Sequence, residues 1–106
     1  MNEIKLKKLL GIRIKHYRNK LGLTQEELGE KIDRTQRQVS LIELGNSFPN
    51  PETLTNLIKV FGCTMKELFD FEPIVNIENL REKTHLLIDK LNDENIKIIF
   101  SIAKNL

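Results

Sequence analysis

Apolar residues recur at spacings of three and four up to about residue 70, which is the period of amphipathic helices. The longest early stripe contains Leu10, Ile14, Tyr17 and Leu21. Shorter stripes follow it: Leu28 and Ile32; Val39 and Ile42; Leu54, Leu57, Ile58 and Phe61; Leu68 and Phe69. The pattern predicts helices over residues 6–21, 25–32, 36–44, 51–61 and 65–70.

Capping signals support these boundaries. A Thr followed three residues later by Glu or Gln can form a capping box, and Asn before Pro is a favourable helix start. Glycine just past a helix end can adopt the left-handed conformation of a C-terminal cap. Such starts and stops occur at Thr24–Glu27, Thr35–Gln38, Thr64–Glu67 and Asn50-Pro51, and at Gly22, Gly45 and Gly62.

A different pattern begins after Pro73, which is expected to end the first unit because the residue before proline avoids helical geometry. A helix over 78–91 is predicted from a seam at Leu80, Thr84, Leu87 and Leu91. Another helix starts at an Asn92 or Asp93 cap and is apolar over a face wider than one partner helix needs. We therefore predict an all-α protein with a five-helix domain over 1–72 and a C-terminal pair of helices over 73–106.

Composition excludes several classes of protein. The chain has 106 residues, 40% hydrophobic and 30% charged, which suits one small globular domain with an appendage. Its single cysteine, Cys63, cannot form an internal disulfide, and no Cys or His cluster has metal-ligand spacing, so neither metal nor cofactor is expected. No signal peptide and no apolar run of the ~18 residues that a membrane span needs is present, which predicts a cytoplasmic protein without membrane contact. No nucleophile, base and oxyanion donors are grouped, so no catalytic residue and no enzyme activity is expected.

Charge is unevenly distributed. The net charge is only +2, yet residues 1–20 carry seven basic side chains against Glu3 alone. The net charge by itself is weak evidence for nucleic-acid binding, and its concentration at the N-terminus is more informative.

Residues Thr24 to Gly45 hold two short capped helices joined by a tight connection, which is helix-turn-helix spacing. Gly29 is small enough to let the second helix cross the first closely. On the second helix Val39, Ile42 and Glu43 share one side, and Arg37, Ser40, Leu41 and Leu44 lie on the other.

The outward side starts with Gln36 and Arg37, where a helix that enters the major groove presents side chains to bases. Gln pairs with adenine, Arg with guanine, and Leu41 can pack on a thymine methyl group. Leu41 could instead pack on the loop near Phe48, and Gln38 could serve either the capping box or the groove.

The motifs resemble those of the phage repressor and Cro-type helix-turn-helix family over about residues 9–70. They are Leu23-Thr24-Gln25-Glu26-Glu27-Leu28, Val39-Ser40-Leu41-Ile42-Glu43-Leu44-Gly45, Pro49 and Glu52-Thr53-Leu54. The resemblance implies base contacts by Gln36, Arg37 and Leu41, and an ion pair between Arg18 and Glu43. It further implies that Gln25 bonds a DNA phosphate and braces the recognition helix. The other expected phosphate contacts are Thr24, Thr35, Ser40, Lys15, Asn46 and Ser47.

The sequence departs from the family pattern at two places. Asp33 occupies the turn position that glycine usually holds, so the connection is expected to be slightly strained or reshaped. The loop Asn46-Ser47-Phe48-Pro49 lacks basic residues, so backbone amides and the basic first helix are expected to supply more of the phosphate contact.

The expected function is sequence-specific binding to a double-stranded DNA operator by a homodimeric transcriptional repressor or regulator. The C-terminal helices could form the dimer interface, complete the core of one monomer, or bind another protein through residues 74–106 as in an antitoxin. The expected interface residues are Leu80, Leu87, Leu91, Ile96, Ile99, Phe100 and Ala103.

Overall fold

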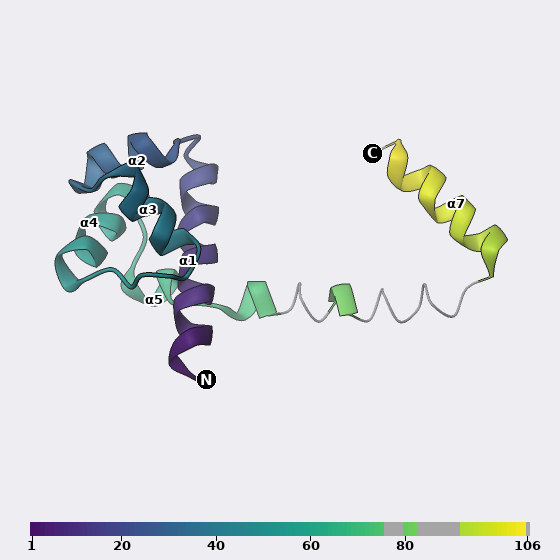
Figure 1. Ribbon diagram of the computed structural model, residues 1–106, viewed down its shortest axis with the longest axis horizontal. Helices are drawn as coiled ribbons and strands as arrows, with labels where there is room; N and C mark the ends of the chain where they lie inside the picture. The colour runs from purple at the N-terminus through teal and green to yellow at the C-terminus, as the bar shows by residue number, and fades with distance from the viewer. Residues whose placement is uncertain (76–79, 83–91, 106) are drawn as a thin grey trace. The chain divides into compact units, whose positions relative to one another are not determined.

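The computed structural model describes residues 1–75, 80–82 and 92–105, and within these ranges its regular structure is entirely helical, as predicted (Figure 1). Five helices form the N-terminal part: α1 (Glu3–Lys20), α2 (Gln25–Ile32), α3 (Gln36–Glu43), α4 (Pro51–Phe61) and α5 (Met65–Leu68). The C-terminal part contains α7 (Asp93–Lys104).

The capping signals fix most helix ends where the sequence places them. All three Thr capping boxes are formed, each with reciprocal bonds between the Thr and the residue three positions later. Asn50 caps α4 by accepting a hydrogen bond from the Thr53 N–H at 2.8 Å. The three glycines have φ values of 70°, 78° and 65°, which is the left-handed geometry expected of residues that end helices.

Three boundaries differ from the prediction. Helix α1 begins three residues earlier because Asn2 accepts a hydrogen bond from the Lys5 N–H at 2.8 Å and so caps an additional turn. Helix α5 ends at Leu68 instead of residue 70. Residues 72–75 are helical, so Glu72 does not avoid helical geometry before Pro73 as expected, and Pro73 lies in the first turn of a helix, where proline is tolerated.

The C-terminal prediction divides between described and undescribed residues. Residues 80–82 are helical, and most of the remaining 78–91 segment lies outside the described residues. Helix α7 follows the predicted Asn92 cap, whose side chain accepts a hydrogen bond from the Asn95 N–H at 2.9 Å.

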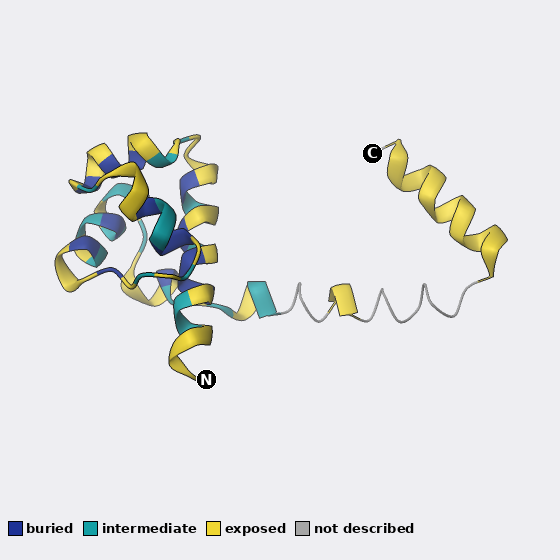
Figure 2. Ribbon diagram, viewed as in Figure 1, coloured by how far each residue is buried: buried dark blue, intermediate teal, exposed yellow. Residues whose placement is uncertain are grey.

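The predicted apolar stripes of the first five helices converge on one core, except for Leu21, which is 48% exposed just past the end of α1. Figure 2 shows their buried positions facing inward. Burial of this apolar surface is the main favourable term that holds the helices together. The core cluster consists of Leu10, Ile14, Leu28, Ile32, Val39, Ile42, Leu57, Phe61 and Leu68.

Two glycines allow close backbone approach. A Cβ atom on Gly11 would lie 2.5 Å from the carbonyl oxygens of both Ile42 and Glu43, so only glycine lets α3 end against α1 in this way. A Cβ on Gly29 would lie 2.5 Å from the Arg34 carbonyl oxygen. The close contact of Gly29 is therefore with the turn before α3 and with Thr35, the cap residue of α3.

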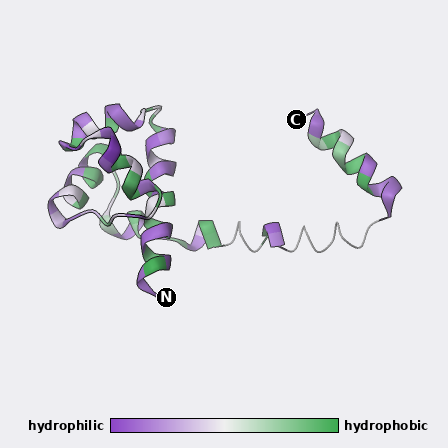
Figure 3. Cartoon of the chain, viewed as in Figure 1, coloured by the Kyte–Doolittle hydropathy of each residue, from purple (hydrophilic) through white to green (hydrophobic). Residues whose placement is uncertain are grey.

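The chain forms two compact units, Met1–Glu72 and Pro73–Leu106. In the second unit every residue of α7 is exposed, and an apolar stripe runs along the helix between polar positions (Figure 3). No helix in the described ranges has the length and hydropathy needed to cross a membrane.

Candidate nucleic-acid interface

Helix α3 has one buried side and one accessible side. Val39, Ile42 and Glu43 are buried, as the sequence pattern predicts, while Gln36 and Arg37 are exposed in the first turn. Ser40 and Leu41 are half-buried. Leu41 was expected to be exposed, and the loop that follows α3 accounts for the difference because Leu41 lines a cavity with Ser47 and Phe48.

Gln38 is exposed and forms the capping box of α3. Its Oε1 accepts a hydrogen bond from the Thr35 N–H at 2.9 Å, and its own N–H donates to the Thr35 hydroxyl at 3.1 Å. The capping interpretation is therefore correct for the free protein. Because the side-chain oxygen is used in the cap, only the side-chain amide nitrogen is left to bond another molecule, and an amide nitrogen can only donate hydrogen bonds.

A buried ion pair joins α1 to the end of α3. Arg18 Nε donates to Glu43 Oε2 at 2.6 Å and Arg18 Nη2 donates to Glu43 Oε1 at 3.0 Å, while Nη1 donates to the Leu23 carbonyl at 2.7 Å. The two residues are only 8% and 7% exposed. Hydrogen bonding to the Glu43 carboxylate holds the pKa of Arg18 above its ordinary value. The pair implied by the resemblance is present, and its two-pronged geometry leaves neither charge unpaired.

Gln25 connects the start of α2 to this pair. Its Nε2 donates to Glu43 Oε1 at 3.1 Å, so the side chain braces α3. The amide nitrogen carries two N–H groups, and a phosphate oxygen can accept a bond from the second. Phosphate binding and bracing are therefore chemically compatible at Gln25, which is half-buried.

The other expected phosphate-binding residues occupy two kinds of position. Thr24 and Thr35 are exposed helix caps, and their hydroxyl groups accept from the backbone of the following helix while keeping one O–H to donate. Lys15 is exposed one turn after Gly11, on the side of α1 that meets α3. Asn46 is exposed and Ser47 is half-buried.

Two backbone amides of the loop after α3 are already bonded within the protein. The N–H groups of Asn46 and Ser47 both donate to the Leu41 carbonyl, at 2.9 and 3.2 Å. They complete the C-terminal end of α3 and are not free for a phosphate. The expectation of loop amide contacts is therefore wrong for these two residues.

Asp33 adopts the left-handed conformation with φ 56° and ψ 50°, and its N–H donates to the Gly29 carbonyl. The turn therefore keeps the geometry that glycine would provide, at the modest strain that Asp carries there.

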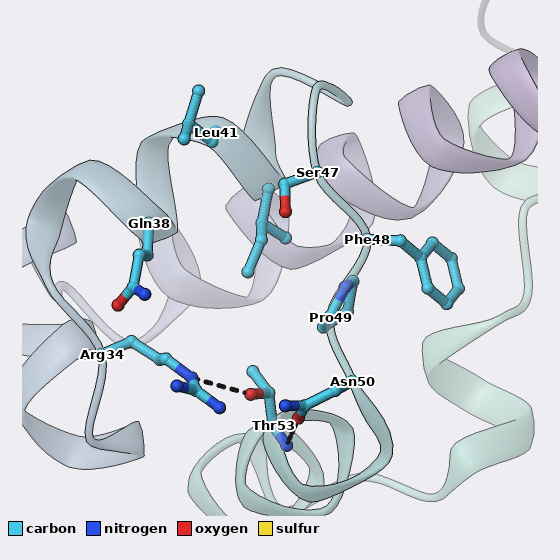
Figure 4. Close-up of a pocket in the computed structure, with 9 residues that line it drawn as sticks. Arg34, Gln38, Leu41, Ser47, Phe48, Pro49, Asn50 and Thr53 are labelled. Atoms are coloured by element: carbon cyan, nitrogen blue, oxygen red, sulfur yellow. Dashed lines mark hydrogen bonds between the residues drawn. The ribbon is translucent and has the colours of Figure 1, made fainter.

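Arg34 is a residue of this surface that sequence reasoning missed. Its Nε donates to the Thr53 hydroxyl at 3.0 Å, and Thr53 is buried on the first turn of α4. Arg34 also lines a cavity of about 210 Å³ between α3 and the α3–α4 loop (Figure 4). In this view Leu41 and the ring of Phe48 point in different directions, so the half-burial of Leu41 comes from the loop near Phe48 and not from contact with the ring itself. The sequence does place an arginine immediately before the cap of α3. It does not indicate the partner of that arginine, which lies 19 positions away.

Some of the predicted interface residues of the C-terminal unit are exposed, and others lie outside the described residues. Leu80 is 62% exposed, whereas Leu87 and Leu91 lie outside the described residues. On α7 the side chains of Ile96, Ile99, Phe100 and Ala103 share an arc of about 100°. All four are exposed, with Phe100 at 68%.

Within the described ranges no group of three or more His, Cys, Asp or Glu residues could hold a metal ion. Cys63 is half-buried, and burial raises the pKa of its thiol.

Comparison with known proteins places this geometry in a family. A family model described as Helix-turn-helix matches residues 14–68, more than half of the chain. The chain is 28% identical over 74 residues to the transcriptional activator BcrR of Enterococcus faecalis, a match that covers 70% of this chain but only 36% of that protein. It is 27% identical over 84 residues to the competence pilus inhibition repressor of Acinetobacter baylyi, covering 77% of this chain and 76% of the repressor.

The fold is also found in a solved structure. The clp gene regulator ClgR of Corynebacterium glutamicum superposes with a TM-score of 0.65 at 20% identity, covering 79% of this chain and 90% of that one. Together with the matched residues 14–68, which include the capped helices α2 and α3, these findings identify the chain as a member of the phage repressor and Cro-type helix-turn-helix family of DNA-binding transcriptional regulators.

Proposed function

We propose that the protein is a transcriptional repressor that binds specific double-stranded DNA sites as a homodimer, with α3 in the major groove. The observation that supports this most directly is the exposure of Gln36 and Arg37 at the start of a helix whose other side is buried. A helix fits the major groove, and these two side-chain types can each make two hydrogen bonds to one base.

Each residue has a proposed role at the DNA. Gln36 reads adenine, Arg37 reads guanine, and the accessible part of Leu41 packs on a thymine methyl group. Gln38 keeps its cap and donates from its amide nitrogen to a base acceptor. Phosphate contacts set the register of α3, and the side chains that make them are Gln25, Thr24, Thr35, Ser40, Lys15, Asn46 and Ser47.

The Glu43 carboxylate gives this arrangement stiffness. Gln25 and Arg18 both donate hydrogen bonds to Glu43, which lies at the end of α3. A phosphate bound at Gln25 is therefore linked to α3 through the Gln25 side chain. A recognition helix held in this way loses little conformational freedom when it enters the groove, which favours affinity.

The dimer is proposed to form through the C-terminal unit, residues 73–106. The face of α7 made by Ile96, Ile99, Phe100 and Ala103 is exposed, and a second copy can bury it at roughly 25 cal/mol per Å² of apolar area. Two copies related by a two-fold axis then present two α3 helices to two half-sites.

Light scattering with two charge variants tests the dimer. Phe100→Asp should convert the dimer to a monomer because it places a charge in the apolar face. Ser101→Asp adds the same charge to the same helix outside that face and should leave the dimer intact. Equal behaviour of the two variants contradicts the proposed interface.

We favour repression over activation because a protein that merely occupies a promoter site can repress transcription. The match to the Acinetobacter repressor covers 76% of that protein, whereas the match to the Enterococcus activator covers 36%. A promoter fusion in cells distinguishes the two, since a repressor lowers expression from its own selected site.

Selection of bound sites from random duplexes at one fixed salt concentration tests DNA recognition itself. A symmetric site with two half-sites is expected. Arg37→Ala should relax the preference at one base position in each half-site, while Lys15→Ala should weaken all sequences about equally. Absence of any preferred sequence for the wild-type chain contradicts the proposal.

The exposed face of α7 also favours a second candidate, an antitoxin-like protein whose residues 74–106 bind another protein. Light scattering separates the two functions. A monomer that keeps this face exposed in solution supports the second candidate and argues against the homodimer.

A further inference from the structure

We propose that Arg34 binds a DNA backbone phosphate at the α3–α4 loop and so supplies the positive charge that this loop lacks. The inference rests on the proposed DNA-binding function and adds a residue that the helix-turn-helix motif itself does not indicate.

The loop has little of its own to offer an anion. Residues 46–49 include no charged side chain, and Pro49 has no N–H group. The backbone N–H groups of Asn46 and Ser47 are both bonded to the Leu41 carbonyl. Asn46 and Ser47 can still donate from their side chains, but these are neutral, so a positively charged donor at this edge of the surface has to come from outside the loop.

Arg34 reaches the same cavity from the other side. It lies in the turn before α3 and lines the cavity together with Ser47 and Pro49 (Figure 4). None of the residues that line this cavity is Asp or Glu. Glu30 and Asp33 line a different pocket beside Arg34, so on the side of the loop cavity the guanidinium faces no carboxylate and an anion would bind there favourably.

Thr53 orients the guanidinium. Its hydroxyl accepts from Arg34 Nε at 3.0 Å, and its own N–H donates to the Asn50 side chain at 2.8 Å. Thr53 is only 2% exposed, so the accepting hydroxyl is fixed in place. One edge of the Arg34 side chain is therefore held by the protein.

The remaining donors of Arg34 suit a phosphate. A guanidinium has five N–H groups, and the bond to Thr53 uses one of them. Over residues 1–75, 80–82 and 92–105, the terminal nitrogens Nη1 and Nη2 make no hydrogen bond. Two parallel N–H groups match two phosphate oxygens, and a side chain already oriented loses less freedom when it binds them.

Salt-dependent binding to two duplexes tests the proposal, one with the selected site and one with random sequence. Arg34→Met should weaken binding to both by a similar factor of about ten, as expected for the loss of one charge-assisted contact. The slope of log affinity against log salt should fall in magnitude by about 0.9, the value for one phosphate. Lys59→Met removes the same charge from the exposed end of α4 and should change neither quantity appreciably.

Variants at Thr53 test the positioning role. Thr53→Val should weaken binding to both duplexes, and Thr53→Ser, which keeps the hydroxyl, should recover most of the loss. In the Arg34→Met background, Thr53→Val should add no further loss of affinity, because its effect acts through Arg34. A purely structural role of Thr53 would give equal losses in both backgrounds.

Arg34→Lys provides a variant that keeps the charge if Arg34→Met fails to fold, and it should keep the salt slope while losing part of the affinity. An unchanged slope in Arg34→Met, with wild-type protein binding normally, overturns the proposal alone. A loss confined to one base position also overturns it, because Arg34 would then read a base. Wild-type protein that binds neither duplex overturns the proposed function and this proposal with it.

Discussion

The buried pair of Arg18 and Glu43 provides a quantitative test of how α3 is held. Glu43→Gln keeps the shape of the side chain but removes its charge, which leaves the buried Arg18 guanidinium with only neutral acceptors, the Gln side-chain oxygen and the Leu23 carbonyl. Removal of one partner from a buried ion pair destabilises proteins by about 3–5 kcal/mol. A unit the size of Met1–Glu72 has a total stability of roughly 4–11 kcal/mol.

Thermal unfolding of the full chain should therefore show a large effect. For a unit of this size each kcal/mol lowers the Tm by about 4–8 °C, so a loss of 3 kcal/mol corresponds to at least about 12 °C. Glu30→Gln removes the same charge from an exposed position on α2 and should change the free energy of unfolding by less than about 0.5 kcal/mol.

A double variant distinguishes charge pairing from simple loss of packing. Arg18→Met and Glu43→Leu should each be strongly destabilising alone, whereas together they should lose less than the sum by about 1 kcal/mol or more, because neither charge is left unpaired. Strict additivity of the two single effects would refute the argument that the charges are coupled.

Three further predictions concern local structure. Gly11→Ala should lower the free energy of unfolding by about 1–3 kcal/mol through backbone clash, measured by urea titration, whereas Gly22→Ala meets no neighbouring atom and should be destabilised only by the strain of its left-handed φ. Asp33→Val should be about 1–2 kcal/mol less stable than Asp33→Gly in the same assay, since a β-branched residue tolerates positive φ poorly, and equal stability would contradict the left-handed turn. The Cys63 thiol, whose pKa is raised by burial, should be alkylated more slowly at mildly alkaline pH in the folded chain than in urea; equal rates would argue against its burial.

The parts of the fold that could be predicted from the sequence are those set by neighbouring residues. A capping box joins positions three apart, so Thr24 and Thr35 identify the starts of α2 and α3 without knowledge of the rest of the molecule. Glycine at a helix end is equally local, as Gly62 illustrates after α4. The earlier start of α1 was missed because its Asn2 cap lies outside the apolar stripe that defined the helix.

Contacts between distant positions could not be derived in this way. The approach of Gly11 to the end of α3 depends on how two helices pack, and nothing near Gly11 in the sequence indicates it. Arg18 and Glu43 are 25 residues apart, and only the resemblance to a family suggested their pairing. Arg34 bonds Thr53, which lies 19 positions further along the chain, and neither local pattern nor resemblance indicated this contact.

The charges of the recognition region explain why two arginines so close in sequence should behave differently. Between residues 33 and 50 the charged side chains are Asp33, Arg34, Arg37 and Glu43. The Glu43 charge is neutralised inside the protein by Arg18, so α3 presents no free carboxylate to DNA. Arg37 is exposed on the first turn of α3, whereas Arg34 is held by Thr53 at the loop cavity. Loss of Arg37 should therefore alter which bases are preferred, and loss of Arg34 should alter the salt dependence of binding to every sequence. If Arg34 instead altered the base preference and Arg37 the salt dependence, the proposed orientation of α3 on DNA would be wrong.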